Sequence, residues 1–343
     1  MWGTTTVIED EPPSRPALLE RLRSRLAISI GTAVVIAATL GAMLHLAVSA
    51  QREIAREDRL ARMRATGQAL TSAIDRAGRF ALAQAETTAR RPAVQKALAI
   101  EDRAALGELS EGPWAYLKEQ SGVTIYGYHS ADMRYLLRVH KPESHGDDVS
   151  RQRPMVLAAN KSGRSQVGIE IGVTGLVGVR GVAPIRLGDR LVGTMEVGLD
   201  LQPILDQVRA ATNTDLAVVL SRSLAGLPAA DGAAGDLMIT ATTDPVRFLE
   251  ALRAGRLPIV RETEIGSLAG GDVEDALLRM PLVDFSGRLV GNLLFHAAFP
   301  EQAAQERRIS TDLSVVAIVG GILAFAVFSV LAFGVVGRRE NET

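Results

Sequence analysis

The chain of 343 residues contains no cysteine and carries almost no net charge. Without cysteine it can form neither disulfide bonds nor thiolate metal sites. A formal net charge of −1, with no basic patch interleaved with aromatic residues, argues against nucleic-acid binding. The sequence also lacks a P-loop, a Gly-x-Ser-x-Gly elbow and a Cys/His arrangement. We therefore predict that the protein is not an enzyme and needs no cofactor.

Two further patterns suggest chemistry only superficially. Residues 270–274, Gly-Gly-Asp-Val-Glu, resemble the signature of cyclic-dinucleotide synthases but depart from it at the fourth and fifth positions, and we interpret them as a turn. His129, His140 and His145 lie within 17 residues, with Asp147 and Asp148 beside them. Zinc or nickel could use such ligands. Residues 146–148 equally form a loop and helix-capping signal, so we predict no metal site.

Two uncharged apolar runs, residues 26–48 and 313–336, bracket a polar segment of 264 residues. The runs are 23 and 24 residues long, and as helices rising about 1.5 Å per residue each can span a hydrocarbon core of roughly 30 Å. We therefore predict two transmembrane helices that enclose an extracytoplasmic segment, residues 49–312.

Arginines flank the outer ends of both runs. They are Arg15, Arg21, Arg23, Arg25, Arg338 and Arg339. Because basic residues stay on the cytoplasmic side, the tails 1–25 and 337–343 should both be cytoplasmic. A cleaved signal peptide is the alternative, since Val48-Ser49-Ala50 precedes Gln51. The first run exceeds the roughly 7–15 residues of a signal peptide's apolar region, which favours an uncleaved anchor.

The segment between the spans alternates helical and strand patterns, which predicts an α+β fold. Residues 49–90 contain no proline and place Met63, Leu70 and Ile74 on one helical face. Further helices are predicted at 94–109, leading to Pro113, and at 201–211, 243–254 and 300–312. Strands are predicted at 124–128, 135–140, 166–172, 176–187, 190–199, 216–220, 258–265, 276–283 and 289–296.

A partial internal repeat indicates two copies of one fold. Residues 184–193 read PIRLGDRLVG and residues 281–291 read PLVDFSGRLVG, so the shared Arg-Leu-Val-Gly ends lie 98 residues apart. Each copy is predicted to be a strand, a tight turn, a second strand and an exiting helix. This divides the segment into a long helix (49–90), a membrane-distal module (91–211), a membrane-proximal module (212–300) and a return helix (300–312).

This arrangement resembles a double Cache sensor, a pair of PAS-like modules that follows a long helix. The more specific matches are residues 137–140 (LRVH), 146–148 (GDD), 153–154 (RP), 168–172 (GIEIG), 180–184 (RGVAP), 191–193 (LVG) and 196–198 (EVG). The resemblance covers residues 49–312 and implies a periplasmic domain that is anchored in a bacterial inner membrane. In chemoreceptors and sensor kinases of this kind, a small ligand usually binds the distal module and a HAMP segment and output domain follow. Here only seven residues follow the second span.

The candidate ligand-binding residues lie in the predicted distal sheet. They are Tyr126, Tyr128, Arg138, His140, Arg180 and Glu196. Strand alternation places Arg138 and His140 on one face, and Arg180 and Glu196 interrupt apolar strands. Guanidinium groups there could bind a carboxylate or an amino acid. The alternative is an Arg180–Glu196 or Arg138–Asp148 ion pair that stabilises the sheet.

The repeat favours a ligand site in the distal module only, because the counterparts of Arg180 and Glu196 in the proximal module are Leu277 and Leu294. We therefore predict a membrane-anchored small-molecule sensor that signals through a separate partner protein. The alternatives are a structural or assembly subunit that uses the Cache fold as a docking surface, and a truncated receptor. Both spans contain small residues four positions apart, which favours a homodimer through the membrane helices. They are Ala33, Ala37 and Gly41 in the first span, and the pairs Ala317 with Gly321 and Gly320 with Ala324 in the second.

Overall fold

The computed structural model of the protein describes residues 15–229, 235–268 and 275–340. The predicted turn at 270–274 lies outside these residues. The chain divides into two compact units, one formed by Asp58–Pro300 and the other by Met1–Glu57 with Glu301–Thr343.

The secondary structure is mixed, as the sequence predicts. The helices are α1 (Arg15–Ala89), α2 (Pro92–Ala99), α3 (Arg103–Ser121), α4 (Pro154–Ser162), α5 (Leu201–Thr212), α6 (Arg222–Ala225), α7 (Pro245–Arg253) and α8 (Pro300–Glu340). The strands are β1 (Val123–Ser130), β2 (Tyr135–Arg138), β3 (Gln166–Ile171), β4 (Val177–Leu187), β5 (Arg190–Asp200), β6 (Asp215–Ser221), β7 (Leu237–Thr242), β8 (Glu264–Gly266), β9 (Asp275–Val283) and β10 (Leu289–Ala298).

The strands form two antiparallel five-stranded sheets with the same connectivity. The distal sheet has the order β2-β1-β5-β4-β3 and the proximal sheet the order β7-β6-β10-β9-β8. The repeated Arg-Leu-Val-Gly sequence begins β5 in one sheet and lies at the start of β10 in the other. A Cβ atom added at Gly193 or Gly291 would collide with a carbonyl oxygen of the neighbouring strand, that of His129 or Val219. Glycine is needed at both positions, and the prediction of two copies of one fold is confirmed.

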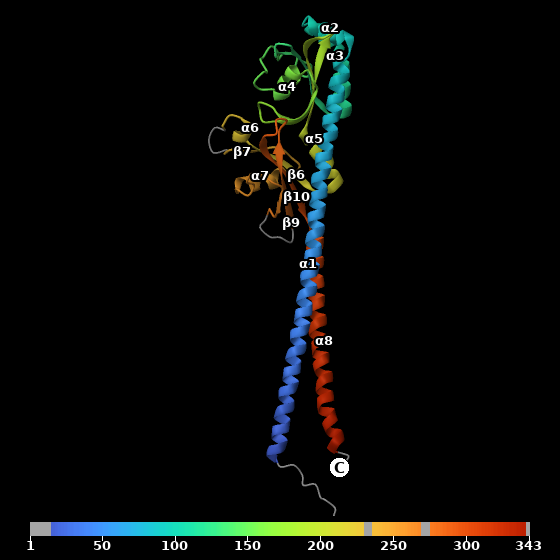
Figure 1. Ribbon diagram of the computed structural model, residues 1–343, viewed down its shortest axis with the longest axis vertical. Helices are drawn as coiled ribbons and strands as arrows, with labels where there is room; N and C mark the ends of the chain where they lie inside the picture. Colours follow the sequence, from blue (N-terminus) through green and yellow to red (C-terminus); the bar gives the residue numbers. More distant parts are fainter. Residues whose placement is uncertain (1–14, 230–234, 269–274, 341–343) are drawn as a thin grey trace, which may run out of the picture. The chain divides into compact units, whose positions relative to one another are not determined.

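Helices cover both faces of the distal sheet (Figure 1). On one face α1 and the α2–α3 pair pack against an apolar cluster that includes Ala81, Ala85 and Leu98. On the other face α4 contributes Met155 and Val156 to a second apolar cluster. The proximal sheet likewise has α7 on one of its faces, where Phe248 is fully buried.

The predicted helix at 94–109 is wrong in its bounds. A break at residues 100–102 separates α2 from α3, and α3 continues through Pro113 to Ser121. Proline lacks the N–H group that would bond the carbonyl four residues earlier. Here the carbonyl of that residue, Leu109, accepts a 3.0 Å hydrogen bond from the guanidinium of Arg91 instead. A distant side chain therefore allows the helix to contain this proline.

The predicted strand at 258–265 is also largely wrong, because only Glu264–Gly266 forms a strand there. The backbone of Val260 is paired with a side chain instead. The Asn292 carboxamide accepts from the Val260 N–H at 2.8 Å and donates to its carbonyl at 2.9 Å. Three elements were not predicted at all, namely α4, α6 and β7.

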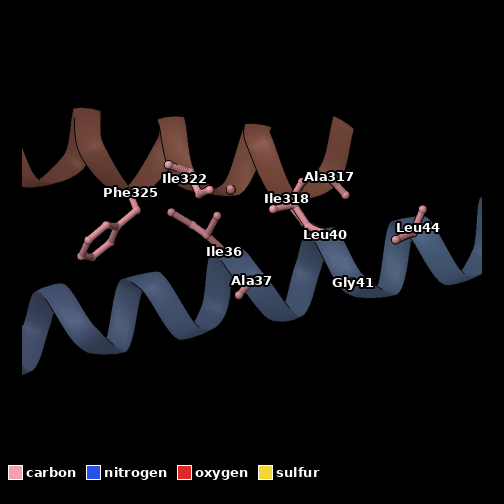
Figure 2. A pocket seen from close by; sticks show the side chains of 10 residues that line it. Ile36, Ala37, Leu40, Gly41, Leu44, Ala317, Ile318, Ile322 and Phe325 are labelled. Carbon is pink, nitrogen blue, oxygen red and sulfur yellow. The ribbon is translucent and has the colours of Figure 1, made fainter. Parts of the chain in front are cut away.

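Parts of α1 and α8 are long and apolar enough to cross a membrane, and their most apolar windows are not buried. Within the unit formed by the chain ends, a groove of about 480 Å³ separates the two helices (Figure 2). Its lining is apolar and includes the small residues Ala37, Gly41, Ala317 and Gly321. These small residues therefore face the groove between two helices of one chain.

Candidate functional site

Arg180 and Glu196 meet in the interior of the distal module. They lie on the neighbouring strands β4 and β5, and the guanidinium Nη1 donates to the carboxylate Oε1 at 2.7 Å. Arg180 is 4% exposed and Glu196 is not exposed at all. The ion pair that we considered as the alternative to a ligand contact is therefore present.

Two further charged residues, Arg153 and Glu170, lie beside this pair. We call the four residues Arg153, Glu170, Arg180 and Glu196 the distal charge cluster. Arg153 lies just before α4, and its Nε is 2.9 Å from Glu170 Oε2 on β3. Arg153 also pairs with Glu196, and Arg180 Nε lies 3.6 Å from Glu170 Oε2. Each arginine thus contacts both glutamates, so the two positive and two negative charges balance.

The charge cluster also anchors helix α4 to the sheet. Arg153 is the residue immediately before the helix, and Pro154 occupies its first turn. The Met155 N–H has no partner within the helix, because it lies in the first turn. It donates to Glu170 Oε1 at 3.1 Å instead. The position of α4 therefore depends on Glu170, which lies on the edge strand β3.

His129 and Tyr135 lie beside Glu196 in the same interior. His129 Nε2 and the Tyr135 hydroxyl are each 3.5 Å from Glu196 Oε2. Burial, together with the charges of Arg153 and Arg138, holds the pKa of His129 well below its usual 6.5. His129 is therefore neutral in the folded protein at neutral pH and adds no charge to the cluster. Its Nδ1 is 3.1 Å from the Thr194 hydroxyl.

Arg180 keeps its charge despite complete burial. Desolvation and the nearby Arg153 lower the pKa of Arg180 to about 10, which leaves it protonated at neutral pH. Some buried atoms of the cluster meet their partners without the geometry of a hydrogen bond. Among the described residues these are Arg153 Nε and Nη2, Arg180 Nε, Glu170 Oε2 and His129 Nε2. Each of them lies at ion-pair distance from a group of the cluster.

Arg138 lies near the cluster but pairs with Asp147, and not with Asp148 as the alternative interpretation had it. Two parallel hydrogen bonds of 2.7 Å join Arg138 to Asp147, and these bonds hold the pKa of Asp147 below its usual value. The guanidinium also stacks 3.6 Å from the Tyr135 ring centroid. Asp148 forms an isolated backbone bridge with Arg134. Asp148 instead accepts from the Ser150 N–H.

The other candidate residues lie apart from the charge cluster. Tyr126 and Tyr128 point to the opposite face of the sheet, where their hydroxyls bond Thr88 of α1 and Ser110 of α3. Burial raises the pKa of both phenols, so both stay protonated at neutral pH. His140 lies beyond β2, which ends at Arg138, so the predicted strand to His140 is wrong. Its Nδ1 is 3.3 Å from the backbone N and O of Tyr126.

The proximal module has an apolar core at the equivalent place. Arg180 pairs with Gly198 in the distal sheet, and Leu277 pairs with His296 at the same position in the proximal sheet. Leu277 and Leu294 are each 1% exposed and pack with Phe248 of α7. The fold therefore does not require charges at these two positions.

Sequence reasoning missed Arg153, Glu170 and His129 as parts of the site. Glu170 could have been found, because a charged residue interrupts an apolar alternating strand there. Arg153 could not have been found, because it precedes a helix that was not predicted and the local sequence does not indicate where its side chain points. The described residues contain no group of three or more His, Asp or Glu side chains that could hold a metal ion. The arrangement holds charged and polar groups together in a buried interior.

Comparison with known proteins gives one family match. Residues 56–298 match the family model dCache_3, described as a double sensory domain of two-component sensor kinase. A search of curated proteins found no match.

Solved structures show similarity at low sequence identity. The sensor domain of the Vibrio cholerae histidine kinase DctB is 10% identical over 71% of this chain and 98% of that chain, with a TM-score of 0.44. The periplasmic domain of Vibrio cholerae LuxQ is 14% identical over 69% of this chain and 100% of that chain, with a TM-score of 0.40. The ligand-binding domain of the Campylobacter jejuni chemoreceptor Tlp3, in complex with L-valine, is 10% identical over 73% of this chain and 95% of that chain, with a TM-score of 0.44.

Proposed function

Because the chain belongs to the double Cache family of sensory domains, we propose that it is a membrane-anchored sensor of small extracytoplasmic molecules. The family is a ligand-binding module without catalytic activity, and we extend this to the whole protein, which would act by binding alone. Helices α1 and α8 support anchoring by their length and apolar composition.

The observation that carries this proposal is the difference between the two modules. They share one fold, yet the distal module buries Arg180 and Glu196 where the proximal module buries Leu277 and Leu294. Buried charges are costly, and an apolar core would stabilise the fold as well. These charges, with the polar groups of His129 and Tyr135 beside Glu196, support a polar small-molecule site that takes a carboxylate or an amino acid.

In this proposal a ligand changes the balance between two states of the sensor, which requires different affinities for them. A separate protein would then read the change through the membrane helices or the periplasmic surface. The apolar groove between α1 and α8 offers a surface for such a protein or for a second copy of the chain (Figure 2).

A thermal-shift screen of small carboxylates, amino acids and amines tests the ligand proposal on the full chain in detergent. We expect a compound that stabilises the protein, because a ligand at about 100 times its Kd adds roughly 2.7 kcal/mol to the free energy of unfolding. Arg180→Lys should abolish the shift, since lysine cannot offer the planar two-donor fork.

Arg279→Lys is the matched control, because Arg279 lies on β9, the proximal counterpart of β4, and should leave the shift intact. If no compound stabilises the wild type, the ligand proposal fails. The balanced and closed charge cluster would then favour the docking-subunit function, with the ion pairs acting only to hold the sheet and α4.

Protease treatment of spheroplasts tests the proposed membrane topology. Because two apolar helices flank the domain and arginines lie at their outer ends, we expect the protease to digest residues 49–312 while tags at both termini stay protected. Immunoblots of the two tags provide the measurement. Digestion of the N-terminal tag, or a mature protein that begins at Gln51, would contradict the uncleaved anchor.

A further inference from the structure

The proximal module contacts the distal module through the turn between β9 and β10. The Phe285 N–H in this turn donates to the carbonyl of Ile169 on the distal edge strand β3, at 2.8 Å. A Cβ atom added to the neighbouring Gly168 would lie only 3.3 Å from the Phe285 side chain. The turn of one module is therefore seated on the free edge of the other module's sheet.

The Phe285 side chain is part of the distal interior. It packs against the apolar cluster of α4, which includes Met155, Val156 and Tyr135. The same elements hold the distal charge cluster. Met155 donates to Glu170, which lies two residues after Gly168 on the same face of β3, and Tyr135 approaches Glu196. Phe285 thus packs against the elements that hold the charge cluster, although it belongs to the proximal module.

The turn that presents Phe285 is held by a buried carboxylate. Asp284 is 8% exposed and accepts hydrogen bonds from the Ser286 N–H at 2.9 Å and the Arg288 N–H at 3.0 Å. The Arg288 guanidinium adds two more, at 2.7 and 3.0 Å. Strand β10 continues from this turn to Ala298, and α8 begins at Pro300. Phe285 is therefore joined, through this hydrogen-bonded turn, to the strand that leads into α8.

We propose that Phe285 is a positioning residue of the distal charge cluster and couples its state to the β9–β10 hairpin. Phe285 holds β3 and α4 against each other, and Glu170 joins these two elements. Movement of α4 or of Glu170 then moves the hairpin. This coupling does not depend on the proposed function, except for the claim that a ligand is what moves α4 and Glu170.

Hydrogen–deuterium exchange on the full chain in nanodiscs tests the proposal without any ligand. Phe285→Ala should speed exchange in α4 and β3 about tenfold, because it removes apolar contacts that close those segments. Phe285→Leu should restore protection, since it returns most of the apolar volume. Phe299→Ala is the matched control, because Phe299 is also half-buried but packs against the core between α1 and the sheets. It should leave α4 unchanged.

The reverse direction distinguishes coupling from simple loosening. Glu170→Gln should speed exchange in β10 in the wild-type background, with α3 unchanged as the internal reference, and this effect should disappear when Phe285 is already alanine. Unchanged α4 exchange in Phe285→Ala would overturn the proposal, as would an equal β10 response to Glu170→Gln in both backgrounds. A failed ligand screen would count against the proposed function and leave this result standing.

Discussion

Replacing Glu196 with leucine should lower the free energy of unfolding of the protein by about 3–5 kcal/mol, because it leaves a buried positive charge without its partner. Glu196 is not exposed and pairs with both Arg153 and Arg180. Glu170 alone cannot balance the two remaining guanidinium groups. Chemical denaturation followed by circular dichroism measures the change.

The double variant Arg180→Leu with Glu196→Leu is the decisive comparison. It reproduces the leucine pair of the proximal module and leaves one arginine and one glutamate, so the charges balance again. We expect it to recover most of the stability that the single variant loses, since replacing a whole buried ion pair by apolar residues is often neutral. If the double variant were less stable than Glu196→Leu, the ion pair itself would stabilise the fold, beyond the effect of balancing the buried charges.

Gly181→Ala should be about as damaging, with an expected loss of about 3 kcal/mol or more. Strand β4 crosses α1 at this glycine, and an added Cβ atom would collide with the backbone of Leu82 and lie 2.6 Å from the carbonyl carbon of Ala81. Backbone atoms of a long helix cannot rotate away as a side chain can. Strand and helix would have to separate along the core that they share.

The control for this substitution is Gly107→Ala in α3, where an added Cβ atom meets nothing within 4 Å. Alanine is favoured over glycine in a helix by about 1 kcal/mol, so this variant should be as stable as the wild type or more stable. Thermal unfolding of the two variants in parallel provides the measurement. Equal melting temperatures for both would contradict the close packing of β4 on α1.

Much of the architecture could be predicted from the sequence because its determinants are local. Turn residues and a period of two marked the hairpin of β1 and β2 and the pair β4 and β5, and the repeated Arg-Leu-Val-Gly marked the second copy. The identification as a double Cache domain is confirmed by the family match. The ligand, the partner and the orientation of the termini stay predictions.

The sequence by itself determined most of the helices and strands, the presence of two copies of the fold, and the unusual position of Arg180 and Glu196 within apolar strands. Tertiary structure alone decided that Arg153 joins these two residues, that Arg138 pairs with Asp147, and that Asn292 takes the place of a strand at Val260. Secondary structure follows from periodicity along the chain. A buried charge, by contrast, is paired by whichever opposite charge the folded chain brings within reach, and that distance is not encoded in local spacing.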